Sequence, residues 1–338
     1  MQVKNWSDIS NEFRDTLVLG NGASIAIDQR FDYRSLLEKG RELGLITPQV
    51  QKIFNYLKAE DFEEVLLILG FVRNINKNLE IKEETTTNAY GEIREALIKT
   101  ILKIHPEHGV VKPYFPAMRE FLRHFRRIIS LCYDLTLYWS IGDDIKHFAD
   151  GFGNGGLFVG NWPDGWMQRN SYTSIFYPHG NLFLVTDSDG KPKKIKRDAG
   201  SDLRTEITKA WNHCTPLFVC EGDWSQKLKA IRNSNYLLKV YDEWIPRPKE
   251  TLAIYGWSLN NDDHIIKQLC ESKGLKKIAV SVHQHTLPKP FDGYCDEIEQ
   301  KIKGLNPNIQ EILFYDSESP ACWIHSHHPS TTGSCSFL

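Results

Sequence analysis

Thr16-Leu17-Val18-Leu19-Gly20-Asn21-Gly22-Ala23-Ser24 is the stretch that decides the fold. Its first four residues are apolar or β-branched and stop at a glycine, which is typical of a buried parallel strand that ends in a tight turn. Glycines at such a turn let the backbone approach a pyrophosphate and present N–H groups to it, and Ser24 adds a hydroxyl. The G-x-G pattern also occurs in plain turns, and the third glycine of the dinucleotide fingerprint is absent. The motif by itself leaves phosphate binding and a plain turn as two open interpretations.

Short apolar runs of the same kind recur along the chain. Helical patterns separate most of these runs, and strand and helix therefore alternate. Such alternation predicts a Rossmann-like α/β fold, in which helices flank a doubly wound, mostly parallel sheet. The further runs cover residues 128–131, 217–220, 252–255, 278–282 and 312–315.

One long segment breaks the alternation, because residues 34–127 carry helical patterns alone. We interpret this segment as a helical insertion between the first two strands. The Rossmann domain then comprises residues 1–33 and 128–316, and residues 317–338 form a C-terminal tail.

Two segments after the insertion have an irregular composition. Residues 142–200 are rich in Gly, Asn, Trp and Asp and carry hairpin-like runs at 157–159 and 175–185, as expected of a binding loop. The tail has a spacing of side chains that could hold a metal, but it lacks a second well-spaced pair, so a poorly ordered, polar tail is the favoured interpretation. The side chains in question are Cys322, His325, His327 and His328.

The bulk composition excludes several classes of protein. Hydrophobic residues make up 41% of the 338 residues and charged residues 25%, which is typical of a folded domain. With a net charge of -2, the protein as a whole has no positive electrostatic potential that would attract nucleic acid. The start lacks a signal sequence and no stretch approaches the roughly 20 apolar residues of a membrane span, so we expect a cytoplasmic protein without a membrane partner. The seven cysteines include no C-x-x-C pair, and we expect neither disulfides nor a metal.

Tyr177-Pro178-His179-Gly180 places a histidine between Pro and Gly in a strand-like stretch. An imidazole with a pKa near roughly 6.5 is suited to general-base catalysis near neutral pH. The alternative is an ordinary surface histidine. The surrounding residues favour His179 over the other histidines as a catalytic candidate.

The segment Ile254-Tyr255-Gly256-Trp257-Ser258-Leu259 ends another apolar run. In an open α/β sheet, Gly256 and Ser258 would lie at the same carboxyl edge as Gly20, where ligands bind. Asp262 and Asp263 follow, and we interpret them as helix caps rather than catalytic groups.

Ser130-Leu131-Cys132-Tyr133-Asp134 closes the run that follows the insertion. At the same sheet edge it would also face the nucleotide. Asp134 could bind a ribose or a carboxamide, or cap a turn. The segment alone does not decide between these roles.

Taken in order, these motifs resemble the motif series of sirtuin-like proteins from bacterial defence systems. The series is G-N-G-A-S with Phe31 and Tyr33 after it, then C-Y-D, Y-P-H-G and G-W-S-L-N-N-D. Within that family the chain resembles a branch described only as a domain of unknown function, in which a helical insertion and a Y-x-H-G histidine recur. The resemblance covers most of the chain.

The resemblance implies NAD as the ligand or substrate. It assigns Gly20, Asn21, Gly22, Ala23 and Ser24 to the NAD phosphates. It also implies an NAD+ glycohydrolase that forms ADP-ribose and nicotinamide in antiphage defence, a homo-oligomer, and a DNA translocase (ATPase) or other defence subunit as partner. The other residues that it places around NAD are His179 at the nicotinamide-ribose hydroxyls, Asp134 and Tyr133 nearby, and Gly256 and Ser258 on the adenosine side.

Cys132 departs from the family pattern, which has an asparagine that holds the ribose and the attacking water. A thiol cannot reproduce the paired donor and acceptor of an amide. Two hypotheses follow: a glycohydrolase, or a catalytically silent sensor or scaffold that binds NAD or ADP-ribose. The four-cysteine zinc module of protein deacylases is also missing, which argues against acyl-lysine substrates. Hydrolysis and cyclisation of ADP-ribose share their first step and are not separated by these motifs.

Overall fold

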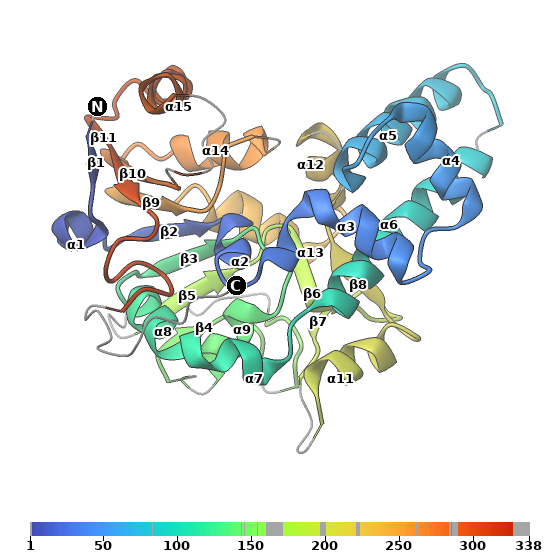
Figure 1. Cartoon of the computed structure of the whole chain (residues 1–338), viewed down its shortest axis with the longest axis horizontal. Coiled ribbons are helices and arrows are strands. Elements are labelled where there is room, and N and C mark those ends of the chain that lie inside the picture. Colours follow the sequence, from blue (N-terminus) through green and yellow to red (C-terminus); the bar gives the residue numbers. More distant parts are fainter. Residues whose placement is uncertain are drawn as a thin grey trace.

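The computed structural model describes residues 2–82, 84–142, 144, 146–153, 155–159, 172–196, 201–220, 224–260, 262–283, 285 and 290–326. Its centre is an eight-stranded parallel sheet with the order β1-β11-β10-β9-β2-β3-β5-β4 (Figure 1). The strands are β1 (Val3–Lys4), β2 (Thr16–Leu19), β3 (Arg127–Ser130), β4 (Phe148–Ala149), β5 (Thr173–Phe176), β9 (Thr251–Tyr255), β10 (Lys277–Val282) and β11 (Glu311–Asp316).

The order of the six inner strands is that of a dinucleotide-binding Rossmann fold. Counted along the chain from β2, these strands lie in the order 3-2-1-4-5-6. The order reverses between β2 and β9, which pair in parallel from Thr16 with Leu252 to Leu19 with Tyr255. This confirms the predicted doubly wound α/β fold and places its topological switch point beside the glycine turn.

Helices connect the parallel strands, because a parallel pair needs a crossover. Among the helices outside the insertion, α8 packs on α9 and α14 packs on α15. The helices outside the insertion are α1 (Trp6–Ile9), α2 (Gly22–Ile25), α7 (His108–Val111), α8 (Phe115–Arg123), α9 (Thr136–Gly142), α11 (Leu203–Ala210), α12 (Trp224–Arg232), α13 (Asn235–Lys239), α14 (Asp263–Cys270) and α15 (Phe291–Leu305), and a π-helical turn, Val240–Trp244, continues α13.

A second, antiparallel sheet differs from the prediction. It has the order β7-β6-β8, with β6 at Gly180–Thr186, β7 at Pro192–Lys194 and β8 at Thr215–Phe218. The prediction that the run at 217–220 belongs to the parallel sheet is wrong, because β8 pairs with β6. The run at 175–185 is not a hairpin, because its first part belongs to β5 of the parallel sheet and its second part to β6 of the small sheet. Gly180 allows this change of sheet, since its φ is +74° and a Cβ there would overlap the carbonyl oxygen of Leu217.

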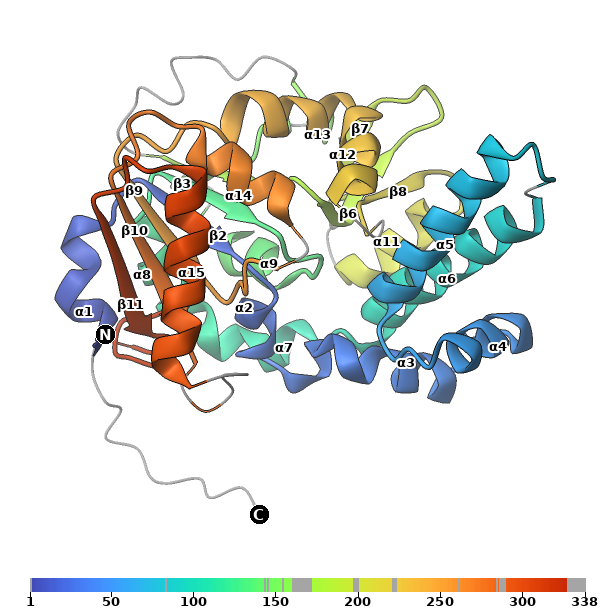
Figure 2. The same ribbon diagram turned by 90° about the horizontal axis from the view of Figure 1, so that it is seen from above.

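The helical insertion forms a lobe beside the sheet, at the right of Figures 1 and 2. It consists of α3 (Tyr33–Glu42), α4 (Pro48–Leu57), α5 (Phe62–Asn78) and α6 (Glu84–Ile104). Asp61 caps α5 by accepting a hydrogen bond from Glu63 N at 2.7 Å. Later in the same segment, α8 returns to the sheet, where the ring of Phe121 lies 6.0 Å from that of Tyr255. The lobe proper therefore ends at α6.

The first part of the expected tail packs against the core. Trp323 is buried and its indole donates to the carbonyl oxygen of Ala23 at 2.8 Å, while Ser319 Oγ accepts from Trp6 N at 2.8 Å. Ser319 and Trp323 are thus packed into the domain, whereas His327 and His328 lie outside the described residues. Within the described part of the chain, no helix combines the length and apolar character needed to cross a membrane.

Candidate functional site

The glycine turn is held against the end of β9. Gly20 N donates to Tyr255 O at 2.9 Å, and Gly22 N donates to Gly256 O at 2.7 Å. A Cβ on Gly22 would lie 2.7 Å from the Cα of Gly256, whose own φ is +65°. The approach of these two strand ends therefore requires glycine on both sides.

Most of the N–H groups of the turn are bonded within the protein. Besides those of Gly20 and Gly22, Ala23 N donates to Gly20 O at 2.9 Å and Ser24 N donates to Asn21 O at 3.0 Å. In this conformation four of the five N–H groups in residues 20–24 are engaged. The turn as it stands offers few donors to a pyrophosphate, so phosphate binding at this point requires the turn to rearrange.

Asp134 and Ser24, two of the residues predicted to share a site, are in direct contact. The Ser24 hydroxyl donates to Asp134 Oδ2, while Thr136 donates to Oδ1 from its hydroxyl and from its backbone N, the latter at 2.7 Å. Asp134 is buried. Both carboxylate oxygens are thus satisfied within the protein.

Cys132 lies beside the glycine turn as a neutral thiol. Its Sγ donates to Gly20 O across 3.1 Å, and burial, with the nearby Asp134 carboxylate, raises its pKa to about 12. A protonated thiol is a poor base and only a weak hydrogen-bonding group, so it does not replace the amide in activating water.

The side chain of Tyr133 contacts the end of β8. Its hydroxyl donates to Val219 O at 2.6 Å and its ring stacks on Phe218 at 4.0 Å. Together with Asp134 it also lines a cavity of about 10 Å³, roughly the room that one water needs. The remaining lining residues are Asn21, Phe31, Leu36 and Ile101, so the helical lobe contributes one wall through α3 and α6.

Asn181 joins the histidine segment to these residues. Its side-chain Nδ2 donates to Cys132 O at 3.1 Å and to Asp134 O at 2.8 Å. The motifs around Gly20, Cys132, His179 and Gly256 are therefore linked by direct hydrogen bonds at the carboxyl edge of β2, β3, β5 and β9. Ser258 is exposed, and its Oγ accepts a hydrogen bond from Asn260 N at 3.4 Å.

His179 lies in a buried polar cluster that the sequence did not reveal. Its Nε2 is 3.1 Å from His264 Nε2 and 3.7 Å from Asp262 Oδ1. Burial, aided by the Lys227 ammonium, holds the pKa of His179 well below its usual range, and burial with the neighbouring His179 lowers the pKa of His264 to about 3. Both imidazoles are therefore neutral near pH 7.

Lys227 connects this cluster to the helical lobe. Its ammonium lies 2.9 Å from Asp262 Oδ1 and 3.3 Å from Glu63 Oε2 on α5, and α12 lies beside α5 in Figures 1 and 2. Burial opposes the charge, but these two carboxylates raise the pKa of Lys227 above its usual value. Burial also raises the pKa of Glu63, and the Asp262 carboxylate is the nearer of the two to the ammonium.

The interpretation of Asp262 as a helix cap is wrong for its side chain. Asp262 occupies the N-cap position of α14, yet its carboxylate makes no capping hydrogen bond and binds Lys227 instead. His264 offered a signal, since it is the second residue of a helix that follows the carboxyl end of β9. Glu63 and Lys227 lie in ordinary amphipathic helices, and nothing in their local sequence distinguishes them from surface charges.

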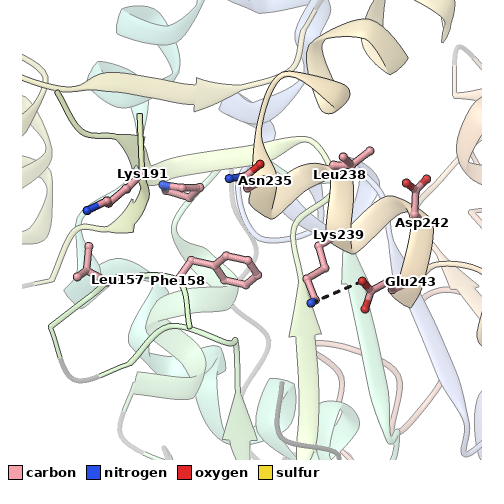
Figure 3. A pocket seen from close by; sticks show the side chains of 9 residues that line it. Leu157, Phe158, Lys191, Asn235, Leu238, Lys239, Asp242 and Glu243 are labelled. Carbon is pink, nitrogen blue, oxygen red and sulfur yellow. Dashed lines mark ion pairs between the residues drawn. The ribbon is translucent and has the colours of Figure 1, made fainter. Parts of the chain in front are cut away.

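A separate cavity of about 510 Å³ opens beside the small sheet (Figure 3). None of the predicted site residues lines it, and its charges are mixed, with Lys239 already paired to Glu243 at 3.5 Å. Its walls are formed by Leu157, Phe158, Lys191, Pro192, Asn235, Leu238, Lys239, Asp242 and Glu243. Residues 160–171 and 197–200 of the expected binding loop lie outside the described residues.

The fold and the linked motifs define a Rossmann-like α/β protein with a buried polar site at its topological switch point. The family described as "Domain of unknown function (DUF4917)" matches residues 17–323, and the chain belongs to this family. The match runs from β2 to Trp323, so it includes the helical lobe and the packed part of the tail. No curated protein shows a significant match to the chain.

Proposed function

We propose that this protein is a sirtuin-like NAD+ glycohydrolase that converts NAD+ and water to ADP-ribose, nicotinamide and a proton. The observation that carries the proposal is the linkage of four separate motifs at the switch point of a 3-2-1-4-5-6 sheet. Open α/β sheets bind dinucleotides at such a point. NAD is the substrate in this scheme, and no resident cofactor is involved.

His179 would act as the general base. A neutral imidazole has a lone pair with which Nε2 can take a proton from a hydroxyl of the nicotinamide ribose. As the bond between ribose and nicotinamide breaks, positive charge develops on the sugar, and water then bonds to the same carbon. The Asp262 carboxylate, 3.7 Å from His179 Nε2, would stabilise the imidazolium.

Substrate entry would require the lobe to move. The cavity beside Asp134 holds roughly one water, and Leu36 and Ile101 of the lobe close one side of it. Displacement of α3 and α6 would give a dinucleotide access to Asn21 and Asp134. This supports a resting state that a partner or an oligomeric contact opens, and a defence role with a DNA translocase as partner remains a prediction from the motif series.

The test is nicotinamide release from NAD+ by the purified chain and by His179→Ala, over a range of protein concentrations. We expect release by the wild type and a loss of roughly 10²-fold or more in the variant. His147→Ala is the matched control, because His147 is exposed, and it should keep full activity. Release that persists in His179→Ala would show that another group is the base.

The silent sensor is a second candidate, and Cys132 favours it. The residue at the position of the asparagine in the sirtuin-like motif series is a neutral thiol bonded to Gly20 O. A sensor would bind NAD+ or ADP-ribose in calorimetry without releasing nicotinamide at any protein concentration. The absence of both binding and release would reject both candidates.

A further inference from the structure

We propose that His179, His264 and Asp262 form a binding site for a divalent transition metal ion such as Zn²⁺. Their ligand atoms all lie within 4.8 Å of one another. Two imidazoles and one carboxylate form a common set of three protein ligands, which leaves a further position for water. This inference goes beyond the proposed function and does not depend on NAD binding.

The distances between the ligand atoms are close to those around a bound ion. Metal–nitrogen bonds of about 2.0–2.1 Å place two nitrogens on the same ion roughly 2.9–3.4 Å apart. His179 Nε2 and His264 Nε2 are 3.1 Å apart, within this range. Asp262 Oδ1 is 3.7 Å from His179 Nε2, so the carboxylate needs only a small rotation to join them.

The surroundings are compatible with two lone pairs directed at one ion. Both histidines are buried, and when each neutral ring carries its proton on Nδ1, the two Nε2 lone pairs are available to the same ion. Asp262 is partly exposed, which gives an ion a route to the histidines. Lys227 already holds Oδ1 of Asp262, so an incoming ion would either share this carboxylate through Oδ2 or displace the ammonium.

A metal at this site has a consequence for His179. The Nε2 lone pair that ligates an ion is no longer available to accept a proton. Occupancy would therefore inhibit the proposed glycohydrolase rather than assist it.

The test is a titration of the EDTA-treated full chain with Co²⁺ and with Zn²⁺ in the absence of NAD+. We expect one ion per chain by elemental analysis, and a visible Co²⁺ absorption band that Zn²⁺ abolishes. Asp262→Asn and His264→Ala should weaken binding by tenfold or more, whereas the exposed-histidine controls His147→Ala and His283→Ala should bind like the wild type.

The wild-type result is decisive even if a variant folds poorly. Absence of a Co²⁺ band and of stoichiometric Zn²⁺ in the wild type would overturn the metal site. Binding that the exposed-histidine variants abolish and Asp262→Asn preserves would overturn it as well. Because no nucleotide is present, these outcomes are independent of whether the protein cleaves NAD+.

Discussion

His179 Nε2 and His264 Nε2 lie 3.1 Å apart in the interior of the protein, although one residue follows β5 and the other belongs to α14. A proton on either ring would place a second cation beside the buried Lys227 ammonium. Burial already disfavours that proton. In the resting protein near pH 7 both rings are therefore neutral.

The first prediction concerns the dependence of stability on pH. An unfolded histidine takes up its proton near pH 6.5, whereas His264 in the folded protein does so only near pH 3. Between these pH values His264 takes up a proton in the unfolded chain but not in the folded protein, so the free energy of unfolding falls as the pH falls. His264 should account for about 2 kcal/mol of the loss between about pH 6.5 and about pH 5. Urea unfolding of the wild type and of His264→Gln at both pH values measures this loss. An equal fall in the free energy of unfolding in the two proteins would contradict the prediction.

A second prediction is that Lys227→Met destabilises the protein by roughly 3–5 kcal/mol, because Asp262 and Glu63 lose their buried counter-ion. Hydrogen exchange should also accelerate in α5, which carries Glu63. The control is Lys99→Met, which breaks an exposed ion pair with Glu95 and should change stability by less than about 1 kcal/mol. Similar losses in the two variants would mean that the buried network adds nothing.

The third prediction addresses the contact between β2 and β9. Gly22→Ala places a Cβ 2.7 Å from the Cα of Gly256, and relief of this overlap should cost about 1–3 kcal/mol or more. Gly293→Ala in α15 meets no atom within 4 Å and should be neutral or slightly stabilising. Thermal unfolding of the two variants compares them. A Gly22→Ala protein as stable as the wild type would show that the strand ends separate easily.

The fourth prediction tests the role of the thiol. Cys132→Asn introduces the amide that the sirtuin-like motif series carries at this position and, if the proposed function is right, should raise nicotinamide release roughly tenfold or more in the folded variant. Cys132→Ala removes the thiol without adding an amide and should not raise it. Activity that rises equally in both variants would indicate that the cysteine only obstructs the site.

The sequence predicts the sheet well where apolar runs are β-branched and end at glycine. The runs at Thr16–Leu19 and at 252–255 both lie in the parallel sheet, and the expected approach of Gly20 and Gly256 follows from that arrangement. The contact of Ser24 with Asp134 follows as well, since both residues come just after neighbouring strands.

Features that depend on long-range packing were not predictable in the same way. The run at 217–220 has the hydrophobicity of a parallel strand, but periodicity does not specify a strand's partner, and its first half pairs with β6 instead. Lys227 carries no local sign of burial, because its partners come from the lobe and from the start of α14. The metal-like grouping around His179 was missed for the same reason.

The hydrogen bond from Gly22 to Gly256 has a consequence for the order of synthesis. A ribosome must translate most of the chain before β9 exists to cover the exposed edge of β2. Until then β2 has an unpaired edge, and neither His264 nor Asp262 has been made. The two imidazoles and the Asp262 carboxylate therefore come together only after the ribosome has passed residue 264.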